Sequence, residues 1–181
     1  MSRRSVPTPA RLVLSAIYRE ERRLEEALPR VQAVVGPVRF AGERMPFDRT
    51  DYYEEEMGAP LCRRFLVARR PVPRDTLAGI KVRMERIERE LSEGGRRTVN
   101  LDPGLLTAES FILATGKNFS HRVYLGEGVF ADLTLVFRQG EFRPLPWTYP
   151  DYASEGIRTL LRDLRREPQA EEVEGRAPAC G

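Results

Sequence analysis

The side chains best suited to chemistry lie in four short polar segments, the first of which spans Pro46–Gly58. It holds five carboxylates and two adjacent tyrosines. Oxygen donors are the ligands that Mg²⁺ and Mn²⁺ prefer, so Asp51 and Glu56 are candidate metal ligands. Tyr52 and Tyr53 are candidate substrate-binding residues, because their rings could stack on a base or a sugar. The alternative interpretation is a capped helical turn whose acidic residues face the positive end of the helix dipole.

The second segment runs from Asn100 to Gly104 and reads Asn-Leu-Asp-Pro-Gly. Polar side chains where a strand meets a loop commonly build sites, so Asp102 is a third candidate metal ligand and Asn100 a candidate substrate-binding residue. Pro103 and Gly104 predict a tight turn, because proline presets φ and glycine accepts a positive φ.

The third segment, Ala114–Leu125, places three cationic or titratable side chains near one strand end. Lys117 and Arg122 are expected to neutralise a phosphate, and His121 to transfer a proton. Lys117 and His121 are therefore the candidate catalytic residues, and Arg122 is a candidate substrate-binding residue. No phosphate loop of the Gly-x-x-x-x-Gly-Lys-Ser/Thr type occurs in the chain, so the Thr-Gly-Lys-Asn of this segment does not indicate a GTPase. A hydrogen-bonded structural role is the alternative for His121, the only histidine.

The fourth segment, Pro146–Tyr152, holds the only tryptophan, two tyrosines and an aspartate. It is either a packed connector that closes the core before a last helix or an aromatic wall for a planar ligand. We favour the connector as the interpretation of Trp147, whereas Asp151 fits both interpretations.

Composition narrows the class of protein. The 181 residues suit one domain, and 41% hydrophobic with 31% charged residues favour a compact fold with a charged surface. Lys81 and Lys117 are the only lysines, and we interpret the arginine bias as genomic, so nucleic acid is a less favoured partner than a small phosphorylated ligand or nucleotide. No apolar stretch approaches about 18 residues, so no membrane partner is predicted. Cys62 and Cys180 form no metal or disulfide framework, which indicates a cytoplasmic protein.

Hydrophobic periodicity predicts the elements that must position these segments. Strands are predicted at 11–18, 38–41, 62–68, 97–101, 109–114, 122–125, 129–137 and 141–145, and helices at 20–35, from 75 to 94, and from 154. Pro29 predicts a kink or break in the first helix. Residues 1–10 are expected to form a flexible leader, 11–166 a single α+β domain, and 167–181 a disordered tail.

The glycines around Glu127 predict a hairpin turn between two of these strands. With a three-residue loop, Leu125 pairs with Val129 and Arg122 faces Asp132 across the ladder. This register places the apolar residues on one side of the sheet, and the pairing with Asp132 gives Arg122 a structural explanation.

The element order β-α-β-β-α-β, followed by further strands, predicts an α+β protein. We expect a ferredoxin-like split βαβ core, which is an antiparallel sheet with helices on one face, extended by C-terminal antiparallel strands and a final helix. Another antiparallel sheet covered by helices on one face is the alternative.

The four segments together resemble an uncharacterised bacterial and archaeal family, domain-of-unknown-function family number 4416. The resemblance covers the chain from about Pro7 to Tyr152. It rests on Phe47-Asp48-x-Thr50-Asp51-Tyr52-Tyr53-x-x-Glu56-Met57-Gly58, Asn100-Leu101-Asp102-Pro103-Gly104, His121-Arg122-x-Tyr124-Leu125 and Trp147-Thr148-Tyr149-Pro150-Asp151-Tyr152. Where many members have Thr-Thr-Lys, this chain has Thr115-Gly116-Lys117. The family brings no established activity, so the resemblance supports the choice of residues without naming a reaction.

Three hypotheses of function follow. The first is an enzyme that acts on a nucleotide or a phosphorylated small molecule with Mg²⁺ or Mn²⁺. The second is a non-catalytic module that binds nucleotide, RNA or protein through its aromatic side chains and arginines. The third is that the polar motifs are architectural. Convergence of Asp51, Asp102, His121 and Asp151 around one pocket, with three of them within the coordination reach of one metal ion, would favour the first hypothesis, and dispersal would remove it.

Overall fold

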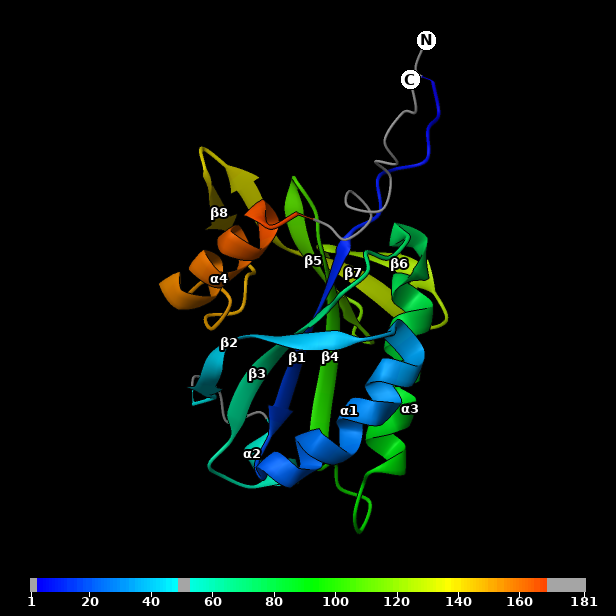
Figure 1. Cartoon of the computed structure of the whole chain (residues 1–181), viewed down its shortest axis with the longest axis vertical. Coiled ribbons are helices and arrows are strands. Elements are labelled where there is room, and N and C mark those ends of the chain that lie inside the picture. The colour runs from blue at the N-terminus through cyan, green and yellow to red at the C-terminus, as the bar shows by residue number, and fades with distance from the viewer. Residues whose placement is uncertain (1–2, 49–52, 169–181) are drawn as a thin grey trace, which may run out of the picture.

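The computed structural model describes residues 3–48 and 53–168 and shows an α+β protein built on one antiparallel sheet (Figure 1). The strands are β1 (Arg11–Tyr18), β2 (Val38–Pro46), β3 (Cys62–Ala68), β4 (Val99–Leu106), β5 (Ser110–Thr115), β6 (Arg122–Gly126), β7 (Val129–Arg138) and β8 (Glu141–Pro144). The helices are α1 (Glu21–Val35), α2 (Glu54–Met57), α3 (Leu77–Glu90) and α4 (Glu155–Arg166). None of the helices in this part of the chain is long and apolar enough to cross a membrane.

The sheet contains eight strands in the order β2-β3-β1-β4-β5-β7-β6, with β8 also paired to β7. Every pairing is antiparallel. The α+β class and the antiparallel sheet are therefore as predicted, and the sheet extends well beyond a four-stranded core. β1 lies in the middle and is buried along its whole length, as its run of apolar residues indicates.

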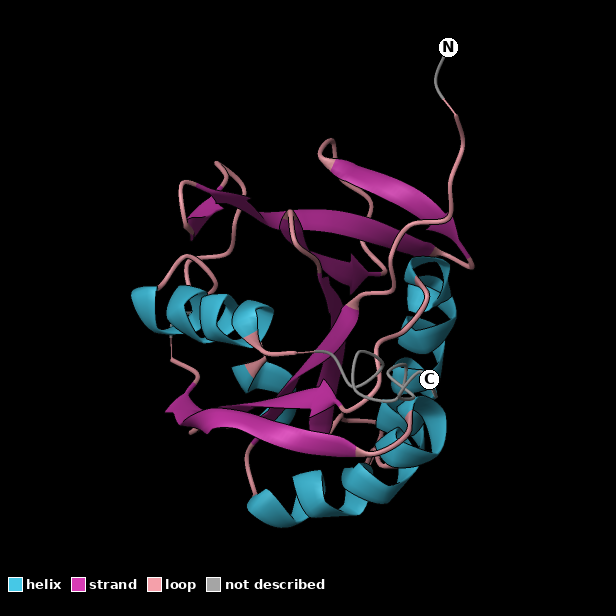
Figure 2. Cartoon of the chain, turned by 45° about the horizontal axis from the view of Figure 1, so that its top comes forward, coloured by secondary structure: helices cyan, strands magenta, loops and turns pink. Residues whose placement is uncertain are grey.

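The two faces of the sheet carry different helices (Figure 2). Alternate side chains of a strand point to opposite faces, so Leu12, Leu14, Ala16 and Tyr18 of β1 pack with α1 and α3, while Val13 packs with α4. We call these the α1/α3 face and the α4 face. The helices α1 and α3 share one face, as predicted, and the final helix α4 covers the other.

The first helix does not break at Pro29. α1 runs from Glu21 to Val35 with this proline inside it. A proline in a helix interior costs about 3 kcal/mol. The helix nevertheless buries Leu24, Ala27 and Val31 in the core, and that packing offsets the cost. Of the predicted kink or break, the break is therefore wrong, and the kink stays a prediction.

Asp102-Pro103-Gly104 forms no turn, which corrects the prediction made from its local chemistry. All three residues lie within β4, where Leu14 of β1 pairs with Pro103. Gly104 is required for close packing instead, since a Cβ there would lie 2.7 Å from the ring of Phe111. The reversal comes later, at Thr107–Ser110, where the Thr107 hydroxyl accepts hydrogen bonds from backbone N–H groups.

The hairpin of β6 and β7 has most of the predicted register. Arg122 pairs with Asp132, and Tyr124 pairs with Phe130. The ladder then shifts, so that Gly126 rather than Leu125 pairs with Val129. Glu127 takes a φ of 53° in the tight turn that results.

The strands β4 and β5 separate along half their length, and this separation prepares the site. Only Gly104–Leu106 of β4 pairs with β5, through Phe111–Leu113. The first half of β4 thus presents an unpaired edge, which α3 covers: Glu88 Oε1 accepts a hydrogen bond of 2.6 Å from the backbone N–H of Leu101. A buried N–H without its strand partner is satisfied in this way.

Candidate functional site

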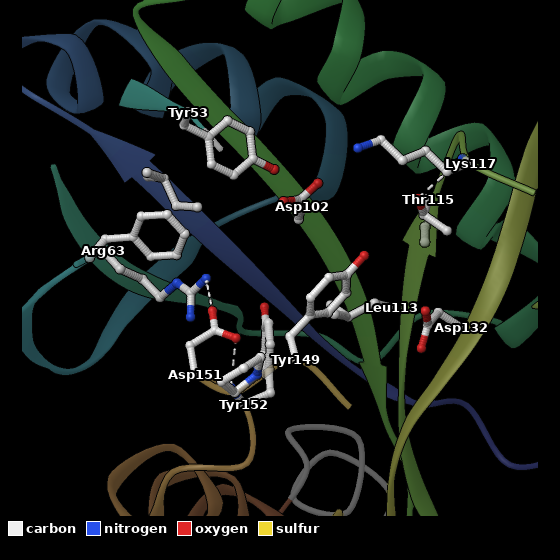
Figure 3. Close-up of a pocket in the computed structure, with 14 residues that line it drawn as sticks. Tyr53, Arg63, Asp102, Leu113, Thr115, Lys117, Asp132, Tyr149, Asp151 and Tyr152 are labelled. Atoms are coloured by element: carbon white, nitrogen blue, oxygen red, sulfur yellow. Dashed lines mark hydrogen bonds and ion pairs between the residues drawn. The ribbon is translucent and has the colours of Figure 1, made fainter. Parts of the chain in front are cut away.

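A cavity of about 370 Å³ lies on the α4 face where β4 and β5 separate (Figure 3). Its volume is in the range of sites that hold small molecules. The floor is apolar, with Ile17 and Leu113, and the walls carry polar and aromatic side chains. These wall residues are Phe47, Tyr53, Arg63, Asp102, Thr115, Lys117, Asp132, Tyr149, Asp151 and Tyr152.

All four polar segments of the sequence reach this cavity. Tyr53 comes from the first segment, Asp102 from the second, Lys117 from the third, and Tyr149 and Asp151 from the fourth. In Figure 3, Tyr53 and Lys117 approach the space in front of Asp102 from opposite sides. Segments separated by up to about a hundred residues in sequence are brought together because β1 pairs with both β3 and β4 while β5 diverges.

Asp102 is held by two donors from the protein. Lys81 Nζ donates to Oδ1 at 2.9 Å, and Asn100 Nδ2 donates to Oδ2 at 2.6 Å. Burial would raise the pKa of Asp102, but the charge of Lys81 and these hydrogen bonds outweigh it, so the pKa lies below its usual value. The carboxylate is therefore ionised and fixed in orientation.

Behind Asn100 lies an arginine with several partners. Arg97 donates from Nε to Glu56 Oε1 at 2.8 Å, from Nη2 to Glu56 Oε2 at 2.5 Å, and from Nη1 to Asn100 Oδ1 at 2.8 Å. Its guanidinium also lies 5.4 Å from the centre of the Tyr53 ring. A bidentate pair of this kind fixes geometry strongly. Arg97 thus connects α2 to the polar residues of β4.

Glu88 is a buried carboxylate of this region, with 4% of its surface exposed. It approaches β4 from α3, where Arg97 Nη1 lies 3.7 Å from its Oε2. Burial raises the pKa of Glu88 to about 7, although Lys81 and the hydrogen bond from Leu101 act in the opposite direction. The protein therefore keeps a carboxyl that titrates near neutrality just behind Asp102.

Asp132 lines the cavity from β7 and organises the third segment. Arg122 Nε donates to its Oδ2 at 2.8 Å, and His121 Nε2 lies 3.3 Å from the same oxygen. The His121 ring stacks on Trp147 at 4.8 Å between centres. Arg122 also donates to the hydroxyl of Tyr149 at 2.8 Å. Neither His121 nor Arg122 lines the cavity directly, and both reach it through Asp132 or Tyr149.

Arg63 forms the wall opposite Asp132. It is 4% exposed, and its Nη2 lies 2.6 Å from Asp151 Oδ2. Its guanidinium lies over the rings of Phe47 and Tyr152, at 4.6 and 4.9 Å from their centres. The other oxygen of Asp151 accepts a hydrogen bond of 2.9 Å from the backbone N–H of Tyr152. This ion pair separates the main cavity from a second one of about 260 Å³, because both cavities share Arg63, Asp151 and Phe47.

The predicted site residues therefore have different positions. Tyr53, Asp102 and Lys117 line the cavity, while Asn100, Arg122 and His121 lie one contact behind it. Asp51 and Tyr52 lie outside the described residues. Lys117 also accepts a hydrogen bond at its carbonyl from Arg122 at 2.9 Å, which fixes the backbone next to β5.

Glu56 lies behind the cavity rather than in its wall. It does not line the cavity, and both of its oxygens accept hydrogen bonds from Arg97. Those hydrogen bonds hold the pKa of Glu56 below its usual value. Within residues 3–48 and 53–168, no group of three or more histidine, cysteine or carboxylate side chains is arranged to hold a metal ion. The metal site of Asp51, Glu56 and Asp102 stays a prediction.

Sequence reasoning missed two residues of the site. Arg63 belongs to the same face of β3 as Phe65 and Val67, which are buried, and a charged residue in that alternation was a signal. Lys81 is on the buried side of α3, next to the apolar stripe that includes Leu77 and Met84. A buried charged residue is rare unless it is paired, so both positions pointed to partners elsewhere in the chain.

The fold and the site define an α+β domain with one eight-stranded antiparallel sheet and a cavity of small-molecule size between two diverging strands. A family model described as "Domain of unknown function (DUF4416)" matches residues 8–167, and the chain belongs to that family. Searches of the curated proteins and of the solved structures found no match.

Proposed function

We propose that this protein is an enzyme that acts on a nucleotide or a phosphorylated small molecule bound in the main cavity. The observation that carries the proposal is the convergence of the four polar segments on one cavity of about 370 Å³. Architectural motifs would have no reason to share a cavity. Concave sites with apolar walls and a few convergent polar groups are where ligands bind in most proteins.

The charges of the cavity suit an anionic ligand. Each carboxylate of its wall is accompanied by a cation: Asp102 by Lys81, Asp132 by Arg122, and Asp151 by Arg63. Lys117, just after β5, also lines the wall. We assign the contact with phosphate to Lys117, because an ammonium group is a common partner of phosphate oxygens.

The aromatic side chains suit the uncharged part of such a ligand. Tyr53 and Tyr149 line the cavity on two sides of the space in front of Asp102, and 44% of Tyr149 is exposed (Figure 3). Stacking on rings accommodates a base or the face of a sugar. His121 would influence the reaction through Asp132, whose Oδ2 it approaches.

A divalent cation remains part of the proposal. Mg²⁺ is usually held by one or two carboxylates together with phosphate oxygens of the substrate, rather than by a complete set of protein ligands. A cation that arrives with the substrate could therefore be held mainly by the phosphate oxygens, near Asp102, which faces the cavity and is ionised. The cation would then neutralise phosphate charge during transfer.

The first test is ligand-dependent stabilisation. Wild-type protein is melted with nucleoside mono-, di- and triphosphates and with sugar phosphates, each with and without Mg²⁺ or Mn²⁺. A ligand at about a hundred times its Kd should raise the Tm by roughly 5 °C or more. Lys117→Met should lose this shift, and Arg83→Met, which alters an exposed cation of α3, should keep it. If no phosphorylated compound shifts the wild type, the proposal fails.

The alternative of a non-catalytic module predicts the same binding without turnover. Each ligand that stabilises the protein is therefore incubated with it and followed by phosphorus NMR and by chromatography. An enzyme converts the ligand, and Lys117→Met reduces the rate. Unchanged ligand after prolonged incubation with either cation favours the module.

We also propose that the first half of the chain is a ferredoxin-like split βαβ unit. The order β2-β3-β1-β4 supports this, as do the positions of α1 between β1 and β2 and of α3 between β3 and β4. An experimental structure that superimposes on that fold over these six elements would test it, and a different helix placement would overturn it.

A further inference from the structure

The carboxylate of Asp102 is oriented by the protein and still open to a ligand. Lys81 occupies one hydrogen-bonding position on Oδ1, and Asn100 occupies one on Oδ2. An ionised carboxylate accepts about four hydrogen bonds, so each oxygen retains capacity for another donor. The side chain is 26% exposed and lines the cavity. A ligand in the cavity can therefore reach this carboxylate.

The donor that suits this carboxylate is neutral. Lys81 already neutralises its charge at 2.9 Å and is itself only 5% exposed, so a second ammonium group would gain little from Asp102. Hydroxyl groups need no such charge and donate to a carboxylate more strongly than to a neutral acceptor. Two hydroxyl groups on adjacent carbons present two donors in the same direction, as the ribose of a nucleotide does to an acidic side chain.

The residues around Asp102 complete the match to a ribosyl phosphate. Lys117 and Tyr53 approach from opposite sides of the space in front of the carboxylate (Figure 3). A ribose placed there would have its diol on Asp102, its phosphate toward Lys117, and its base or anomeric side toward the aromatic rings.

We propose that Asp102 accepts hydrogen bonds from a vicinal diol, so that the substrate is a ribosyl phosphate with free 2′- and 3′-hydroxyl groups. Lys81 is a positioning residue that reaches through the gap between β4 and β5 to orient that carboxylate. The inference rests on the proposed function, because it names the substrate class of the same cavity.

The distribution of lysine supports the role of Lys81. The chain has two lysines and 28 arginines, and both lysines belong to this site, one in the wall and one bonded to a wall residue. A lysine presents a compact ammonium on a flexible stem, whereas arginine presents a wide planar fork. Lys81 reaches Asp102 between two strands, and a flexible stem with a compact ammonium suits that position. Lys81→Arg should therefore not replace the native residue.

The binding experiment compares matched ligands on the full chain by calorimetry. The four ribonucleoside 5′-monophosphates and their 2′,3′-dideoxy counterparts test the diol, adenosine with dideoxyadenosine tests it without phosphate, and ribose 5-phosphate tests it without a base. For the ribonucleotide that binds best, removal of the diol should weaken the Kd by about tenfold to a hundredfold. Binding of ribose 5-phosphate with comparable affinity would identify a sugar phosphate rather than a nucleotide as the ligand.

The variants test the assignment to Asp102. Asp102→Asn alone would leave the buried ammonium of Lys81 without its partner, so the uncharged pair Lys81→Met with Asp102→Asn is used as well. Circular dichroism and urea denaturation establish that it is folded. The double variant should bind ribo- and dideoxynucleotides with equal affinity. The ratio of its Kd values for adenosine and AMP, which reports the phosphate contact, should equal that of the wild type. Lys81→Met alone should reduce the ratio of the Kd values for dideoxynucleotide and ribonucleotide, which we call the diol ratio. It should leave unchanged the ratio of the Kd values for adenosine and AMP, which we call the phosphate ratio. A merely structural role does not produce this separation.

The outcomes distinguish a failure of the diol inference from a failure of the proposed function on which it rests. Equal wild-type affinity for ribo- and dideoxynucleotides overturns the diol inference and leaves the proposed function intact. A diol ratio that persists in the double variant overturns the role of Asp102. If adenosine binds more tightly than dideoxyadenosine and a phosphate group adds no affinity, the diol inference is supported and the proposal of a phosphorylated substrate is overturned. Absence of binding by every probe overturns both.

Discussion

The two faces of the same sheet are built in opposite ways. On the α1/α3 face, the side chains of β1 are Leu12, Leu14, Ala16 and Tyr18, and none is more than 1% exposed. On the α4 face, the same strand presents Ser15 and Ile17 beneath a cavity bordered by Arg63 and Asp102. One face gains stability from continuous apolar packing. The other also has an apolar core beneath α4, but around the cavity it buries the charges of Arg63, Asp132 and Asp151, which seldom stabilise a fold and commonly mark a site.

The difference shows where a change should affect stability alone and where it should also affect binding. The apolar side chains of the α1/α3 face have no access to the ligand, so they contribute to binding only by keeping the protein folded. Residues of the α4 face hold the ligand and each other. The four predictions below separate the two faces, and they are arranged from the largest expected effect to the smallest.

The largest effect is expected from a cavity in the α1/α3 face. Leu14→Ala removes a fully buried side chain from the central strand and should lower the free energy of unfolding by about 3–5 kcal/mol. Urea denaturation measures the loss. Leu125→Ala, at an exposed position of β6, is the control and should change stability by less than about 0.5 kcal/mol. Ligand affinity per folded molecule should match the wild type in both variants, and a loss of affinity in Leu14→Ala would contradict the separation of the faces.

On the α4 face, the equivalent change is Arg63→Met. It leaves the carboxylate of Asp151 buried without its partner at 2.6 Å and should cost about 3 kcal/mol. Arg63→Met combined with Asp151→Asn removes both charges and should recover most of that stability. Ligand affinity should fall in both variants because the cavity wall is altered. Full recovery of affinity in the double variant would show that Arg63 only holds Asp151 in place.

Glu88 lies where the two faces meet, and it gives a pH-dependent effect. Its folded pKa of about 7 is higher than that of an unfolded glutamate, so the folded protein holds a proton on this residue between about pH 4.5 and 7. Stability from Glu88 is therefore full below the unfolded pKa and is lost as the pH rises through the folded one.

Glu88→Gln should test this because the amide oxygen can still accept the N–H of Leu101. The variant should gain stability over the wild type as the pH rises from 5 to 8, by about 2–3 kcal/mol at pH 8. Urea denaturation at unit intervals of pH measures the difference. A constant difference across this range would show that Glu88 has an ordinary pKa. Glu90→Gln, on the exposed side of α3, is the control for the substitution itself and is measured over the same range.

The sequence was sufficient to predict the elements whose signal is local. The apolar stripe of α3 depends on spacing within one element, and the helix forms where that spacing indicated. β7 also forms where predicted, but a register shift against β5 interrupts its alternation, so Val129 and Leu135 pack in the cores of opposite faces. The pairing of Arg122 with Asp132 also followed, because a glycine-rich turn limits the register of a hairpin.

What the sequence did not predict depends on contacts between distant segments. Asp-Pro-Gly has strong turn chemistry, yet eight consecutive pairings with β1 hold it in β4. Glu56 belongs to an acidic segment that suggested a metal, yet Arg97 binds both its oxygens from a loop forty-one residues away. The cavity itself exists because β5 leaves β4 after three pairs, a register that no motif encodes.

Gly104 controls that point of separation and gives the smallest effect. A Cβ at this position would lie 2.7 and 2.9 Å from ring atoms of Phe111 and 3.1 Å from the carbonyl oxygen of Ile112. Gly104→Ala should therefore push β5 away from β4 and cost about 1–3 kcal/mol, a typical penalty for overpacking. Since Gly104 begins the short β4–β5 pairing, the widened gap should also weaken ligand binding. Phe111→Leu in the same chain should relieve the contact with the ring. If Gly104→Ala lowers stability but leaves affinity unchanged, the cavity does not depend on where the strands part, and the two faces are more independent than the structure implies.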